Sequence, residues 1–132
     1  MVTIAVKTSR RREMIDVTGH LRQAVTDSGV TNGLALAFVP HTTAGLTINE
    51  NADPDVPRDI LAHLEKMVPA NAAYRHSEGN SDAHIQASLI GSSVTVIVKD
   101  GRLVLGTWQS VFFCEFDGPR QRSLLVEVIK KA

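Results

Sequence analysis

One short stretch of the chain holds more groups able to bind a metal or move a proton than any other segment. Two imidazoles, two carboxylates and an amide fall within nine residues, with a glycine at the centre. A polar turn is the alternative interpretation, but a turn seldom needs two histidines. We therefore treat this stretch as a candidate site. Its chemical groups belong to His76, Glu78, Asn80, Asp82 and His84.

The local sequence also indicates how His84 is presented. Ser81 or Asp82 can cap a short helix over residues 83–90, which would end at Gly91. His84 would then lie in the first turn, where the helix dipole disfavours a protonated imidazole. The neutral form is the one that binds a metal.

A second group of polar residues follows a run of apolar ones. Residues 33–39 are continuously apolar between Asn32-Gly33 and Pro40, which predicts a central, well-buried strand. His41, Thr42 and Thr43 come directly after it. Since a sheet holds the ends of its strands rigidly, this position suits a binding or catalytic site.

A third group, after a short strand over residues 46–48, is rich in side-chain oxygens. A turn followed by a helix cap is the alternative interpretation, because Pro54 and Pro57 mark the start of a helix over residues 56–68. That interpretation explains the asparagines and the aspartate better than the glutamate, which is not a turn former. The group comprises Asn49, Glu50, Asn51 and Asp53.

A later strand adds two polar residues among apolar ones. Gln109 and Glu115 are an even number of residues apart, so they share one face of the strand. Trp108 would point to the other face, with Phe112, and a core aromatic is the plain interpretation of it. Charges are rarely buried without a partner, so we expect Gln109 and Glu115 beside the histidines or at a subunit interface.

Composition excludes several classes of protein. The chain has 132 residues and a formal net charge of zero, so it offers no electrostatic footprint for nucleic acid or an anionic membrane. Arg10, Arg11 and Arg12 form the only basic run, which is best explained as a solvated turn or strand end. The N-terminus does not resemble a signal peptide, and no apolar run approaches the roughly 20 residues needed to span a bilayer. Cys114, the single cysteine, is expected to be a buried and inert thiol, as suits the cytoplasm.

The order of the expected elements gives the fold class. Helices precede an antiparallel C-terminal meander without a βαβ alternation, so residues 1–132 are expected to form one α+β domain. A helix over residues 18–28 would bury Leu21, Ala24 and Val25, and Gly29 would close it. A further helix is expected over residues 56–68, and residues 70–82 form a long irregular connection of the kind that is usually functional or mobile. The remaining strands are expected over residues 2–6, 13–17, 93–99, 102–105, 107–116 and 123–130.

Three histidines from separated segments, together with carboxylates, can form a metal site with an open position. Catalytic zinc sites have this character, with three protein ligands and one water or substrate. The spacing of His41, His76 and His84 matches no standard zinc signature, and the chain has no glycine-rich nucleotide loop and no nucleophile elbow.

Four motifs, in matching order, resemble the YjbQ family, also known as UPF0047. They are His41-Thr-Thr-Ala, Thr47-Ile-Asn-Glu-Asn-Ala-Asp-Pro, His76-x-Glu-Gly-Asn-x-Asp-Ala-His84 and Leu105-Gly-Thr-Trp-Gln-x5-Glu115. The resemblance covers almost the whole chain. It implies a compact α+β domain with three helices and a large mixed, mostly antiparallel sheet, which assembles as a homotrimer.

The resemblance also implies a chemistry. Members are linked to a weak thiamine-phosphate synthase activity, which joins a pyrimidine methyl pyrophosphate to a thiazole phosphate and releases pyrophosphate. A divalent metal ion, zinc or magnesium, is expected on His41, His76 and His84. We expect catalytic roles for Glu50, Glu78, Asp82 and Glu115. Substrate contacts are expected from Thr42, Thr43, Asn49, Asn51, Asn80, Trp108 and Gln109, with Arg75 or Arg120 as possible phosphate partners.

Two alternatives fit the same residues. One is a metal-assisted hydrolysis that uses a bound water. The other is a non-catalytic trimer that binds a metal or a metabolite.

Overall fold

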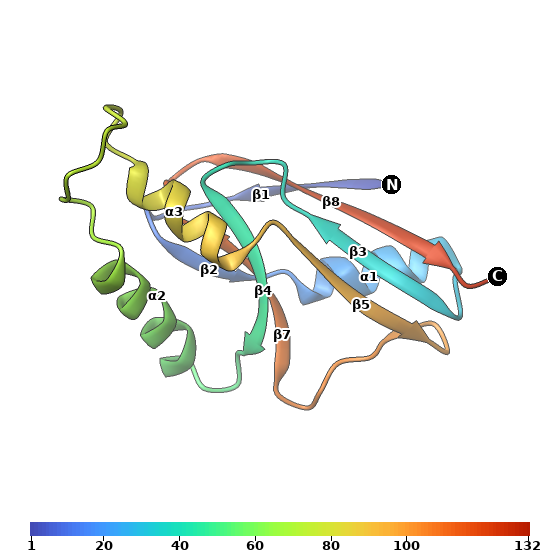
Figure 1. Cartoon of the computed structure of the whole chain (residues 1–132). Helices are drawn as coiled ribbons and strands as arrows, with labels where there is room; N and C mark the ends of the chain where they lie inside the picture. The colour runs from blue at the N-terminus through green and yellow to red at the C-terminus, as the bar shows by residue number, and fades with distance from the viewer.

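The computed structural model describes all 132 residues, which form one α+β domain with three helices, as expected (Figure 1). The helices are α1 (Thr18–Ser28), α2 (Asp55–Met67) and α3 (Ser81–Ile90). The strands are β1 (Val2–Lys7), β2 (Glu13–Asp16), β3 (Gly33–Phe38), β4 (Ala44–Glu50), β5 (Ser93–Lys99), β6 (Arg102–Leu103), β7 (Gln109–Glu115) and β8 (Gln121–Lys130). None of the helices is long and apolar enough to cross a membrane.

All strand pairs are antiparallel, in line with the mostly antiparallel sheet that we expected, and they form two sheets. One sheet has the order β1-β8-β3-β5-β6, and the other has the order β2-β7-β4. β5 and β6 form a hairpin that turns at Asp100-Gly101, where both residues have positive φ. The expected C-terminal meander is wrong, because β7 leaves this sheet and pairs with β2 and β4, while β8 returns between β1 and β3.

The main core lies between the two sheets and includes α1. Leu21 and Ala24 of α1 are buried there, as their spacing predicted, and Gly29 ends the helix in the left-handed conformation. Leu46 of β4 and Phe113 of β7 meet them from the three-stranded sheet. This core fixes the ends of β3, β4 and β8, from which much of the candidate site extends.

A second core lies on the other face of the three-stranded sheet, under α2 and α3 (Figure 1). Phe112, Cys114 and Phe116 point to this side and pack against Leu64 of α2 and Ala87 of α3. The prediction of a buried thiol is confirmed, and burial raises the pKa of Cys114 to about 12. α3 is thereby held against the sheet that carries the candidate strand.

The outer face of the five-stranded sheet has no helix over it. Residues 33–39 were predicted to be buried on both faces, yet Leu34 is 42% exposed and Phe38 is 41% exposed. The neighbouring strands add Ile97 and Ile129, which are also exposed. The prediction was wrong because α1 covers only the inner face, where Ala37 is fully buried.

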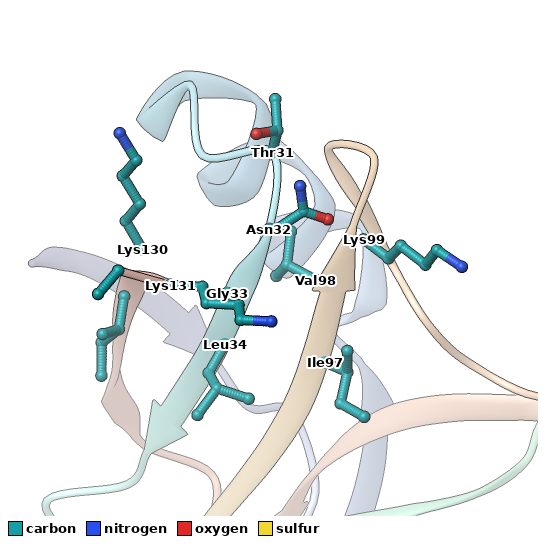
Figure 2. A pocket seen from close by; sticks show the side chains of 11 residues that line it. Thr31, Asn32, Gly33, Leu34, Ile97, Val98, Lys99, Lys130 and Lys131 are labelled. Carbon is teal, nitrogen blue, oxygen red and sulfur yellow. The ribbon is translucent and has the colours of Figure 1, made fainter.

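A hollow of about 680 Å³ lies at the end of this outer face. Figure 2 shows Leu34 and Ile97 on neighbouring strands, with Lys99 and Lys130 nearby. No histidine, aspartate or glutamate side chain lines this hollow. It therefore lacks the acid–base and metal-binding groups that the sequence analysis singled out.

Candidate functional site

A polar cleft of about 610 Å³ lies where three separate segments of the chain meet. The first is the connection from β3 to β4, the second is the His76–His84 stretch, which contributes Glu78, Asn80 and His84, and the third is the connection from β7 to β8; Ser92, after α3, completes the lining. A further hollow of about 510 Å³ runs along α3 and shares His41, Thr42 and His84 with the cleft. The cleft is lined by Phe38, Val39, Pro40, His41, Thr42, Thr43, Glu78, Asn80, His84, Ser92, Asp117, Arg120 and Arg122.

His41 is fixed by a backbone hydrogen bond. The pairing of β3 with β8 ends at Phe38 and Leu125, and two residues before Leu125 the amide of Ser123 donates to Nε2 of His41 over 2.9 Å. The imidazole thus takes the place that a strand carbonyl would have held. Burial and the nearby positive charge of Arg122 hold the pKa of His41 below its usual value.

A buried ion pair forms one side of the cleft. Nε and Nη2 of Arg122 donate to the two carboxylate oxygens of Glu115 over 2.8 Å and 2.5 Å. Nη2 also donates to the hydroxyl of Thr43 over 2.8 Å. The remaining donors to Glu115 are the Thr8 hydroxyl and the Asp117 amide. Burial alone would raise the pKa of Glu115, but these hydrogen bonds hold it below its usual value.

The two histidines of the candidate stretch lie together. The ring centres of His76 and His84 are 5.3 Å apart, with the rings nearly perpendicular. Nδ1 of His76 is 3.2 Å from the Ser81 hydroxyl, and Nε2 is 3.8 Å from a carboxylate oxygen of Glu78. His84 lies on α3 and His76 lies in the connection before it, which extends away from both sheets (Figure 1).

Asn80 carries a buried acceptor without a partner. Its Nδ2 donates to Asp117 over 2.8 Å, while its Oδ1 is buried and has no hydrogen-bond partner. Burial alone would raise the pKa of Asp117, but the Asn80 hydrogen bond and the charge of Arg120 hold it below its usual value. Because buried polar atoms are rarely left unpaired, Asn80 Oδ1 is the one atom of the cleft that calls for a ligand, a water or a cation.

Asp82 does not line the cleft. It is fully buried, and it forms ion pairs with Arg11 and Arg12 of the loop between β1 and β2. Arg12 also donates to Gln86, whose amide donates in turn to the carbonyls of Leu64 and Val68 at the end of α2. This network ties the β1–β2 loop, α2 and α3 together, so Asp82 has a structural role. The prediction of a solvated arginine run is therefore wrong for Arg12, whereas the Arg11 side chain stays 42% exposed.

The oxygen-rich group at the end of β4 and just beyond it lies far from the histidines. In the pairing of β4 with β7, Ala44 is opposite Glu115 at one end, and Glu50 is opposite Gln109 at the other. Six residue steps at about 3.4 Å separate these ends by about 20 Å. The expectation that Asn49, Glu50, Asn51 and Gln109 complete the histidine pocket is wrong within one copy of the chain.

The contacts of this group are local. The Asn49 side chain accepts from the Glu50 amide, and Asn51 donates to Asp16 of β2. Asp53 accepts from the Asp55 amide two residues on, in the turn that leads into α2, while the N-cap of α2 is Pro54 and has no side-chain hydrogen bond. The turn part of the alternative interpretation thus explains Asp53.

Trp108 and Gln109 lie at the same far end of the sheet. Trp108 is 62% exposed, so the interpretation as a core aromatic is wrong. The Gln109 side chain accepts from the Gly106 amide, which closes the turn before β7. Glu115 and Gln109 do share a strand face, as predicted, but only Glu115 lies next to the cleft.

Two charged residues of the cleft were missed from the sequence. Arg122 alternates with the buried Leu124 and Val126 on the same face of β8. An arginine at a core-facing position of a strand indicates a buried partner. Asp117 had no such signal, because Asp117-Gly118-Pro119 is a typical turn sequence. Arg75 is exposed and does not line the cleft.

The residues fit a metal ion only in part. No three histidine, cysteine, aspartate or glutamate side chains stand close enough together to surround an ion. The 5.3 Å between the ring centres of His76 and His84 allows a shared ion, since two imidazoles bound to one Zn²⁺ at about 2 Å have ring centres about 5 Å apart. The unpartnered Asn80 Oδ1 offers an oxygen ligand. His41 does not fit in its present position, because Nε2 already accepts from Ser123.

The chain resembles a set of related proteins over nearly its whole length. A family model described as UPF0047 protein YjbQ-like matches residues 2–131. A UPF0047 protein of Methanocaldococcus jannaschii is 53% identical over 124 residues, which cover 94% of this chain and 90% of the relative. The UPF0047 protein YugU of Bacillus subtilis is 49% identical over 128 residues, with coverage of 96% and 97%.

Solved structures agree with the sequence relatives. A crystal structure of a YjbQ/UPF0047 family protein from Clostridium acetobutylicum has a TM-score of 0.97 and 54% identity, and the match covers 98% of this chain and 100% of the other. A protein of unknown function from Sulfolobus solfataricus has a TM-score of 0.95 at 35% identity, with coverage of 98% and 96%.

Proposed function

The chain belongs to the YjbQ-like UPF0047 family, and on that premise we propose that its cleft is the active site of a metal-assisted transferase for small phosphorylated substrates. The observation that carries the proposal is the convergence of His41, His84, Asn80 and Arg120 on one cleft from three segments. The reaction to test first is thiamine-phosphate formation. There the ring nitrogen of a thiazole phosphate bonds to the methylene carbon of a pyrimidine methyl pyrophosphate, and the carbon–oxygen bond to pyrophosphate breaks.

The charge balance of the cleft favours a metal cofactor. Arg122 is paired with Glu115, and Arg120 is paired with Asp117, so neither arginine brings surplus positive charge. Glu78 adds a carboxylate. A pyrophosphate group entering this cleft would therefore lack a counter-charge from the chain. A divalent ion supplies that charge when bound, and it neutralises the leaving pyrophosphate.

The residues that would hold this ion are His76, His84 and the amide oxygen of Asn80. His84 is presented by the first turn of α3, beside His76. Glu78 lies beside Nε2 of His76, where it can orient the ring. Thr42 and Arg120 are left to hold the phosphate of the second substrate.

We further propose that the protein assembles as a homotrimer through the outer face of the five-stranded sheet. Leu34, Ile97 and Ile129 supply exposed apolar area of the kind that marks an association surface. Phe38 belongs both to this face and to the lining of the cleft, so a neighbouring copy would form an additional wall. Asn49, Glu50, Asn51, Trp108 and Gln109 can take part in the site only from such a neighbour. Sedimentation equilibrium of the untagged protein tests the assembly state.

We place the protein in the cytoplasm, where a single unpaired thiol persists.

The decisive experiment measures thiamine-phosphate formation from the two purified substrates. The untagged protein is first freed of metal and then assayed with and without added Zn²⁺ or Mg²⁺. We expect activity that needs the ion and that the variants His84→Ala and Asn80→Ala lose, while the exposed-site variant His63→Ala retains it. Equal product formation by His84→Ala and the parent would contradict the assignment of the site. Absence of product at every metal concentration would contradict the reaction, and hydrolysis of a phosphoester panel would then be tested.

A further inference from the structure

We propose that His41 acts as a fixed N–H donor, through Nδ1, to a phosphoryl oxygen of the substrate, and that it is not a metal ligand. This inference rests on the proposed function, because it assigns a role to one residue of the same cleft. It also departs from the expectation that all three motif histidines bind the ion.

The argument begins with the hydrogen bond at Nε2. A backbone amide can only donate, so Nε2 of His41 must offer a lone pair to the Ser123 amide. A neutral imidazole carries one proton, which then resides on Nδ1. A metal needs a lone pair on the nitrogen that binds it, and neither nitrogen has a free one in this arrangement. Freeing Nε2 for an ion would leave the Ser123 amide without its acceptor.

Protonation does not change this assignment. A second proton on the ring would sit on Nε2 and meet the N–H of Ser123 head on. The positive charge of Arg122 nearby lowers the pKa of His41. The carboxylate of Glu115 raises it, but that carboxylate is already paired with Arg122. The lowered pKa of His41 agrees with a ring that stays neutral and keeps one donor.

The position of His41 gives this donor a use. His41 is partly exposed and lines both the cleft and the hollow along α3, and no hydrogen bond within the chain engages Nδ1. The Thr42 hydroxyl and the Arg120 guanidinium line the same cleft. A phosphate monoester, which has three oxygens that accept hydrogen bonds, suits three such donors better than a carboxylate does.

Two substitutions of His41 test the roles of its two ring nitrogens separately. In His41→Asn the amide nitrogen can occupy the place of Nδ1, whereas in His41→Gln the amide oxygen can occupy the place of Nε2. His41→Gln should therefore keep the Ser123 hydrogen bond and the stability of the parent, yet lose the donor. His41→Asn should be less stable and keep the donor.

The binding test uses inorganic phosphate and isothermal titration calorimetry. It is run once with a chelator, so that no metal contributes, and once without the chelator and with added Zn²⁺ or Mg²⁺. We expect His41→Gln to bind phosphate about tenfold or more weakly than the parent, since a hydrogen bond to a charged group is lost. His41→Asn should stay within about threefold of the parent. Equal affinity of His41→Gln and the parent would overturn the role of His41 and leave the proposed function standing. No phosphate binding by the parent, with or without Zn²⁺ or Mg²⁺, would overturn both.

The tautomer is tested on the parent protein itself, so the outcome does not depend on how a variant folds. Nitrogen NMR of histidine-labelled protein distinguishes a protonated Nδ1 from a protonated Nε2, and His41→Gln identifies the His41 signals by their loss. We expect the proton on Nδ1 at neutral pH, both in the metal-free protein and after addition of Zn²⁺. A proton on Nε2, or a metal-dependent loss of the Nδ1 proton, would overturn the inference.

Discussion

The buried pair Glu115–Arg122 offers the sharpest test of how the cleft is supported. Glu115 is 0% exposed, and its carboxylate accepts from Arg122, Thr8 and the Asp117 amide. The substitution Glu115→Gln keeps the shape of the side chain and removes the charge. Arg122 is then a buried cation without a counter-ion, which costs about 3–5 kcal/mol of the free energy of unfolding.

The double variant Glu115→Leu with Arg122→Met separates charge from shape. It removes both charges at once and leaves two donors without their acceptor, at the Asp117 amide and in part at Thr8. Thr8 retains its second acceptor, the carbonyl of Arg120. The cost of the unpaired donors is about 1–3 kcal/mol. The double variant should therefore be more stable than Glu115→Gln. Its loss of unfolding free energy should also be far smaller than the losses of Glu115→Leu and Arg122→Met added together.

Urea unfolding followed by far-ultraviolet circular dichroism measures these differences. With a urea dependence of about 2 kcal/mol per molar, Glu115→Gln should lower the midpoint by about 1.5–2.5 M. All variants are compared at one protein concentration, because association would shift the midpoint. Asp59→Asn on the exposed side of α2 is the control, with an expected change below about 0.5 kcal/mol.

Two results would refute the reasoning. One is a loss of less than about 1 kcal/mol for Glu115→Gln, which would mean that water reaches the pair. The other is strict additivity of the two single changes, because residues in direct contact should couple.

Three further predictions concern other parts of the fold. Gly45→Ala should lower the melting temperature and cost about 1–3 kcal/mol, since its Cβ would lie 2.5 Å from the Gly91 carbonyl oxygen, whereas Gly19→Ala in α1 has open space and should gain up to about 1 kcal/mol. Cys114, with its raised pKa, should react with a thiol reagent only when urea unfolds the chain, and rapid reaction in the native state would contradict its burial. Three carboxyl groups have pKa values below their usual range, those of Asp16, Glu115 and Asp117. Their contribution to the free energy of unfolding is therefore present above about pH 5 and is lost as pH falls below about 4 through the lowered pKa values. The midpoint of urea unfolding should drop over that range, and a constant midpoint would contradict these shifts.

Local patterns in the sequence predicted the elements well. Period and capping residues placed α1 correctly, with Leu21 and Ala24 inside and Gly29 at its end. Strand alternation placed Gln109 and Glu115 on one face of β7. These features depend on neighbouring residues, so the sequence contains what is needed to derive them.

The composition of the site was only partly accessible from the sequence. Asn49 and Glu50 stand close to His41 along the chain, but β4 lies between them and carries them about 20 Å away. Asp82 stands among the motif residues, yet its partners Arg11 and Arg12 come from the other end of the chain. Such pairings depend on strand order and register, which local patterns do not determine.

Strand β3 divides its side chains by size. Ala35 and Ala37 point inward and are fully buried, while Leu34 and Phe38, the larger residues, point outward. Because successive side chains of a strand lie on opposite faces, polar substitutions on the outer face leave the inner packing untouched. The surface properties of this face can therefore be changed independently of the fold.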